Sequence, residues 1–205
     1  MTTRDPTLNP VPVAELRPTQ MTVGYREVEA KRHAWRAHHA AHEGQPGQHM
    51  IPVLLGPKGK HYVLDHHHLS RALLDEGVAE IAVDIVADLS TLSKSEFWTF
   101  IDNKGWCHPY DSEGLLQPLT AMPKHVAEMK DDPFRSVAGE LRRQGGYAKD
   151  TTPYAEFLWA DYLRRRIAAK AVAADWDKAL AKALKLAKAP EAQHLPGWSG
   201  PNAGE

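Results

Sequence analysis

Two short apolar runs on either side of a glycine-rich turn form the clearest pattern in the chain. Residues 51–55 and 61–64 are largely apolar, and the sequence GPKGK lies between them. Two glycines and a proline between apolar runs are typical of a β-hairpin. Residues 78–86 alternate apolar and polar side chains and predict another strand. Residues 11–16 predict a short strand at a sheet edge, because Pro12 lacks a backbone donor.

Helical spacing marks the segments around these strands. Residues 23–42 contain good helix formers and no glycine or proline after Gly24, which predicts a mostly exposed helix. Residues 69–74 have apolar side chains at helical spacing, and Gly77 favours a helix end just beyond them. The first half therefore predicts a small α/β unit.

The second half has mainly helical patterns. Ser93 and Glu96 have the spacing of a capping box. Residues 133–143 predict a helix, and a long helix is expected to start at Thr152 and Pro153 and to include FLWADYLRRRI. Its arginine run, three adjacent residues, spreads around the helix and favours packing or solvated roles over one phosphate-binding stripe.

These elements predict an α/β (α+β) fold with a helical extension. We expect an α/β domain over residues 1–90, a mostly helical extension over 91–189 and a loose tail over 190–205, where proline, glycine and small polar residues are frequent. A chain of 205 residues fits one compact domain with an appendage, since domains usually contain roughly 100 to 200 residues.

Composition narrows the function classes. The formal net charge is −1, so the overall positive field of a protein held mainly by nucleic-acid phosphates is absent, and strong nucleic-acid binding is not expected. The single cysteine, Cys107, excludes an internal disulfide framework and is expected to be inert. No signal peptide or long apolar run is evident, so we expect a cytoplasmic protein without membrane contact. The sequence leaves the oligomeric state open.

The strand of the hairpin ends in an unusual group of polar residues, Asp65 followed by His66, His67 and His68. One interpretation is that Asp65 caps the following helix through its carboxylate. A second interpretation is a zinc site, but adjacent helical side chains point about 100 degrees apart, so the three histidines cannot all reach one ion. A third is a phosphate cradle, since a helix N-terminus presents N–H groups and a positive dipole end. An aspartate there could hold magnesium or act as a base.

Other candidates lie outside this turn. Thr19 and Gln20 in the RPTQ loop could face a ligand or serve turn geometry. His38 and His42 have the i,i+4 spacing of a zinc-binding helix face but no evident third ligand, so exposed polar roles are favoured. Glu27 lies four residues before Lys31 and could form a helix-surface ion pair.

The order VPVAEL, RPTQ, helix and IPVLLGPKGKHYVLDHHHLSRALLDEG resembles the N-terminal ParB/sulfiredoxin domain, whose strand-to-helix turn commonly reads Asp-Gly-His-His-Arg. Asp65, His67 and His68 match that pattern, while His66 replaces the glycine and Leu69 the arginine. The segments DDPFRSVAGELRRQGGY and AEFLWADYLRRR make the chain more closely similar to the family called Putative ParB-like nuclease. The turn lacks the catalytic cysteine of sulfiredoxins, which argues against peroxiredoxin repair.

The resemblance implies a pocket for a nucleotide phosphate, with ATP, ADP or CTP and Mg²⁺ as cofactors. The implied activity is a kinase-like phosphotransferase or a nucleotide phosphohydrolase acting on a small molecule such as a free amino acid. The alternative is a ParB-like DNA-binding protein or nuclease. The implied catalytic residues are Asp65, His67 and a base at Glu27 or Glu29, with Asp65 also near the magnesium. The implied nucleotide-binding residues are His66, His67, His68, Arg71, Thr19 and Gln20.

Overall fold

The computed structural model describes residues 10–41 and 50–201. It divides into two compact units. The first comprises residues 1–22, 28–111 and 115–130, and the second residues 23–27, 112–114 and 131–205. Each unit has its own buried core. The chain contains both a β-sheet and several helices, so the mixed α/β class expected from the sequence is confirmed.

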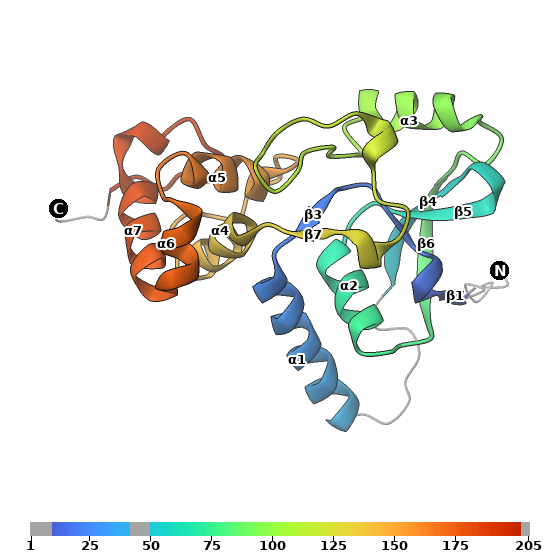
Figure 1. Cartoon of the computed structure of the whole chain (residues 1–205), viewed down its shortest axis with the longest axis horizontal. Helices are drawn as coiled ribbons and strands as arrows, with labels where there is room; N and C mark the ends of the chain where they lie inside the picture. Colours follow the sequence, from blue (N-terminus) through green and yellow to red (C-terminus); the bar gives the residue numbers. More distant parts are fainter. Residues whose placement is uncertain (1–9, 42–49, 202–205) are drawn as a thin grey trace, which may run out of the picture. The chain divides into compact units, whose positions relative to one another are not determined.

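The first unit contains a five-stranded sheet with the order β1-β6-β4-β5-β2. Its strands are β1 (Pro10–Pro12), β2 (Arg17–Pro18), β4 (Ile51–Gly56), β5 (Lys60–Val63) and β6 (Glu80–Asp88). All of them except β2 are labelled in Figure 1. β4 pairs antiparallel with β5 and parallel with β6, while β1 is an edge strand, as its proline predicted. A separate two-stranded sheet joins β3 (Thr22–Val23) and β7 (Lys130–Asp131).

The β4–β5 hairpin confirms the pattern around GPKGK. Lys58 and Gly59 adopt positive φ angles of 61° and 68°, which turn the chain within the short helix η2 (Pro57–Gly59). Gly56 is required by packing, because a Cβ atom there would lie 2.5 Å from the Tyr62 ring. The hairpin carries the chain back along β5, which ends at Val63, two residues before Asp65.

Three helices belong wholly or mostly to the first unit. Helix α1 (Tyr25–Ala41) begins in the second unit and continues in the first from Val28, which is buried. Helix α2 (His67–Asp75) follows β5 and has the buried core positions Leu69, Ala72 and Leu73. Helix α3 (Lys94–Asn103) has the capping box expected between Ser93 and Glu96. The short helices are η1 (Val13–Glu15), η3 (Leu119–Ala121) and η4 (Val126–Glu128).

The second unit is helical. Helix α4 (Pro133–Arg143) matches the expected bounds. The long helix expected from Thr152 is wrong: α5 (Ala155–Arg164) ends at the arginine run, and α6 (Ala169–Ala174) and α7 (Trp176–Lys188) follow as separate helices (Figure 1). Asp175 explains the second break, because its extended backbone and its side chain cap the start of α7.

The expected loose tail from residue 190 is also wrong up to Pro201. After η5 (Pro190–Ala192), Leu195 is buried in the core of the second unit, and Trp159 Nε1 donates to the Pro196 carbonyl at 2.8 Å. The Ala148 N–H donates to the Gly197 carbonyl at 2.7 Å. Small and turn-forming residues here allow close packing against α5.

We predict that Leu195→Ala lowers the free energy of unfolding by about 2 kcal/mol, because it removes a buried side chain and leaves a cavity. Urea denaturation measures this change. The matched control is Glu191→Ala, an exposed position on the same segment that should change stability by less than about 0.5 kcal/mol. Equal stability of the parent and Leu195→Ala would contradict the observed packing.

Candidate functional site

The turn between β5 and α2 has an unusual backbone. His66 lies at the N-cap of α2 with φ 67° and ψ 30°, in the left-handed region. The Asp65 carboxylate does not cap the helix; its Oδ1 accepts the His66 N–H at 2.6 Å. The interpretation of Asp65 as the N-cap of the helix is therefore wrong. The Asp-Gly-His-His-Arg pattern explains this geometry, because its glycine falls on the left-handed residue.

The three histidines of the turn have different environments. His66 is exposed and His68 is half-buried, whereas His67 is only 5% exposed. His67 Nε2 accepts the backbone N–H of Thr19 at 3.1 Å, and Thr19 Oγ1 donates to the Val63 carbonyl at 2.8 Å. A backbone N–H can only donate, so Nε2 of His67 carries no proton in this arrangement. His67 thus positions the turn, and Asp65 and His66 face solvent.

The RPTQ residues serve the same local framework. Thr19 and Gln20 are 2% and 6% exposed, and the Gln20 amide donates to the Thr22 carbonyl at 2.9 Å. Arg71, one turn into α2, donates to the carbonyls of Ala127 and Met129 and pairs with Asp75. Thr19, Gln20 and Arg71 were expected to bind the nucleotide, and each of them forms a hydrogen bond within the first unit.

The two candidate bases have separate partners. Glu27 belongs to the second unit, where Arg143 binds both of its carboxylate oxygens at 2.7 and 2.5 Å. Gly139 permits this pair, since a Cβ atom there would lie 2.9 Å from the Glu27 carboxyl group. Glu29 belongs to the first unit and contacts Arg32, His33 and Arg36 on the surface of α1. Both glutamates are thus engaged by arginine side chains.

Other sequence candidates lie outside this arrangement. Burial raises the pKa of the Cys107 thiol to about 12, and the charge of Asp102 adds to the shift, so the thiol is unreactive at neutral pH. Arg164 pairs with Asp132 and Asp161, and Arg166 stacks on the Tyr162 ring, in agreement with packing roles.

Within residues 10–41 and 50–201, no group of three potential ligands is placed to hold a metal ion. His42 lies outside the described residues.

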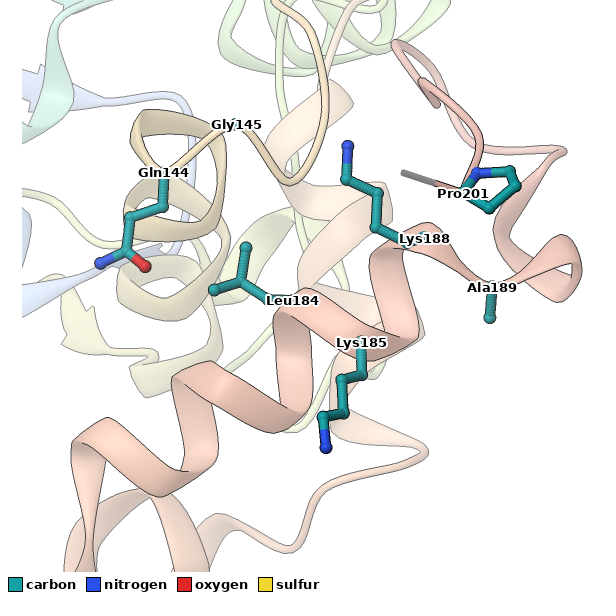
Figure 2. A pocket seen from close by; sticks show the side chains of 7 residues that line it. All are labelled: Gln144, Gly145, Leu184, Lys185, Lys188, Ala189 and Pro201. Carbon is teal, nitrogen blue, oxygen red and sulfur yellow. The ribbon is translucent and has the colours of Figure 1, made fainter. Parts of the chain in front are cut away.

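A cavity of about 430 Å³ opens in the second unit (Figure 2). It is lined by Gln144, Gly145, Leu184, Lys185, Lys188, Ala189 and Pro201. Its two lysine side chains extend in opposite directions in Figure 2, and Lys188 Nζ donates to Ser199 Oγ at 2.7 Å. The ammonium groups do not converge, so this cavity lacks the convergent polar groups of a typical ligand pocket.

No helix in the described part of the chain has both the length and the apolar character needed to cross a bilayer.

We predict that His66→Gly leaves stability unchanged or raises it by up to about 1 kcal/mol, because glycine adopts the left-handed conformation without steric cost. His66→Val should lower stability by about 1 to 2 kcal/mol, since a β-branched residue is strained there. Thermal unfolding of both variants measures the difference. Equal effects of glycine and valine would show that the backbone strain is absent.

We predict that His67→Ala lowers the free energy of unfolding by about 1 to 3 kcal/mol, because the buried Thr19 N–H loses its acceptor. Thr19→Ser is the matched control, since serine keeps the backbone donor and a hydroxyl that can reach the Val63 carbonyl. Urea denaturation of both variants distinguishes the roles. An unchanged free energy of unfolding in His67→Ala would show that His67 does not stabilise the turn.

The comparisons with known proteins agree with this architecture. The family model described as "Putative ParB-like nuclease" matches residues 9–165. The crystal structure of protein Atu1540 from Agrobacterium tumefaciens is similar with a TM-score of 0.89 and 47% sequence identity, over 97% of this chain and 99% of that chain. A comparison with curated proteins finds no match.

Proposed function

Because this chain belongs to the Putative ParB-like nuclease family, we propose that it is a nucleotide-dependent phosphotransferase or phosphohydrolase acting on a small molecule such as a free amino acid. The nucleotide's phosphates bind at the turn between β5 and α2. The observation that carries the proposal is the left-handed His66 at a helix start that has no side-chain cap. Strained backbone of this kind is concentrated at functional sites.

The turn suits an anion for electrostatic and geometric reasons. The first turn of α2 places the positive end of the helix dipole beside two histidines, His66 and His68, that can donate hydrogen bonds. Buried His67, held by Thr19, keeps the neighbouring side chains in place. Exposed Asp65 stands at the entrance to this turn and has one carboxylate oxygen engaged by the His66 N–H.

Asp65 also fits a magnesium ion bound to a nucleotide. Mg²⁺ usually takes one or two protein carboxylates together with phosphate oxygens, so one exposed carboxylate beside a phosphate site is a sufficient protein ligand. Bound magnesium supplies charge neutralisation for the phosphates. ATP, ADP and CTP share the phosphate chemistry and are the candidate nucleotides.

The proton of an attacking hydroxyl goes to the second carboxylate oxygen of Asp65 when that oxygen is not bound to magnesium. Glu27 and Glu29 are less suited as they stand, because guanidinium groups already occupy their carboxylates. His67 acts as a positioning residue, since its Nε2 accepts the Thr19 N–H. The site thus combines one exposed carboxylate with the phosphate-binding helix start.

A nuclease is the second candidate function, and the description of the family model favours it. It would use the same turn, because Asp65 and a metal ion could act on a nucleic-acid phosphate as on a nucleotide. The formal net charge of −1 provides few excess cations for a long polyanion. We therefore place the small-molecule reaction first.

We predict that the parent protein binds at least one of ATP, ADP and CTP in the presence of Mg²⁺, and that Asp65→Asn abolishes turnover while the fold is retained. The fold survives because the asparagine Oδ1 can still accept the His66 N–H. His68→Ala should weaken nucleotide binding by about tenfold, the effect of one lost hydrogen bond to a charged group. Calorimetry and a phosphate-release assay measure the two effects.

The matched control is Asp84→Asn, which removes an exposed carboxylate from β6 in the same unit and should leave binding and turnover unchanged. The proposal fails if the parent binds none of the three nucleotides with magnesium, or if Asp65→Asn turns over like the parent. Metal-dependent plasmid cleavage that is lost in Asp65→Asn would instead support the nuclease.

A further inference from the structure

The second unit contains a buried arginine whose hydrogen bonds are incomplete. Arg135, in the first turn of α4, is 4% exposed. Its Nε and Nη1 atoms are closed to solvent and have no hydrogen-bond partner among the described residues. Its Nη2 atom lies 3.7 Å from Glu156 Oε2, too far for a hydrogen bond. A buried guanidinium with unsatisfied N–H groups is destabilising, so this group calls for an acceptor.

The neighbouring carboxylates are committed to other arginines. Glu156 Oε1 lies 3.1 Å from Arg142, closer than its other oxygen lies to Arg135. Asp132 Oδ2 binds Arg164 at 2.7 Å, and its Oδ1 accepts the Phe134 N–H. Burial lowers the pKa of Arg135, although Glu156 and Asp132 act in the opposite direction. Arg135 therefore shares its carboxylate partner, Glu156, with Arg142 and forms the longer of the two ion pairs.

The guanidinium lies against the start of another helix. Its carbon is 3.5 Å from the centroid of the Phe157 ring, and Phe157 is in the first turn of α5. Stacking on an aromatic face leaves the edges of the planar group for hydrogen bonds. The α5 N-cap, Tyr154, has φ 59° and no side-chain cap, so the positive end of this ten-residue helix faces the same region. Both features favour an anion, and the Glu156 carboxylate in the same turn, held by Arg142, is the charge that opposes it.

We propose that Arg135 binds an oxyanion, a carboxylate or phosphate group of a small-molecule ligand, at the first turn of α5. An oxyanion supplies the acceptors that Nε and Nη1 lack and adds a negative charge to the one that Arg135 shares with Arg142, whereas a water molecule supplies only acceptors. All groups in this site belong to the second unit, so the inference does not depend on nucleotide binding at the α2 turn.

Entry of the anion requires a local movement, because the two nitrogens are covered in the ligand-free chain. The segment 148–153 is exposed and leads directly into the first turn of α5. Its hydrogen bond from the Thr152 N–H to Asp150 Oδ1 is local. Displacement of residues 149–153 would leave the hydrogen bond between the Ala148 N–H and the Gly197 carbonyl in place.

We expect sodium phosphate or sodium acetate to raise the melting temperature of the full chain above its value in sodium chloride of the same ionic strength. Arg135→Met should unfold at the same or a higher temperature than the parent without added anion, because methionine removes a buried, poorly paired charge. The same variant should lose the difference between oxyanion and chloride. The two salts separate a phosphate ligand from a carboxylate ligand.

The matched control is Arg165→Met, which removes an exposed guanidinium at the end of α5 and should keep the full response. A second control is His68→Ala: if it abolishes the response and Arg135→Met retains it, the anion binds at the α2 turn and the inference about Arg135 is wrong. Equal melting temperatures of the parent in all three salts would also overturn it. So would a crystal structure grown with phosphate in which Arg135 contacts a water molecule only.

Discussion

One hydrogen bond, from the Thr19 N–H to His67 Nε2, holds together the candidate site of the first unit. It joins the residue that follows β2 to the first residue of α2, and Thr19 is itself tied to the Val63 carbonyl at the end of β5. The start of α2 is thereby fixed to two strands of the sheet. This rigidity allows His66 to remain in a left-handed conformation that an isolated chain would seldom adopt.

The residues of the turn between β5 and α2 have two different tasks. His67 is buried and engaged, while Asp65 and His66 remain open to solvent. A histidine run that looks uniform in sequence therefore supplies one structural anchor and two accessible side chains. This division is suited to a site in which the backbone geometry must survive the entry and release of a charged ligand.

Consecutive aspartates organise the second unit in a comparable way. Asp131 Oδ1 accepts the Tyr25 N–H at the start of α1, and Asp132 caps α4 and pairs with Arg164. Two adjacent carboxylates thus satisfy the starts of two helices. Arg135, one turn further, is the residue of the DDPFRS segment that this arrangement leaves with incomplete pairing. This incomplete pairing is the basis of the oxyanion site that we propose at Arg135.

Local patterns were sufficient for the elements whose stability is local. The GPKGK hairpin, the Ser93 capping box and the bounds of α4 follow from turn chemistry, capping and helical spacing, which act within a few residues. The family pattern also indicated the position of the strand-to-helix turn. Its left-handed residue could have been foreseen, since the pattern has glycine there.

Tertiary structure decided what each charged or polar residue does. The sequence could not show that His67 accepts the Thr19 N–H or that Arg143 pairs with Glu27. It also could not show that Leu195 is buried in the core of the second unit. Each of these contacts joins residues that are far apart in the chain. The break before α7 is local instead, because Asp175 caps the start of that helix. The sequence by itself determined the β4–β5 hairpin, the cap of α3 and the bounds of α4, because turn chemistry and capping act locally. Long-range burial determined which side chains remain exposed to solvent.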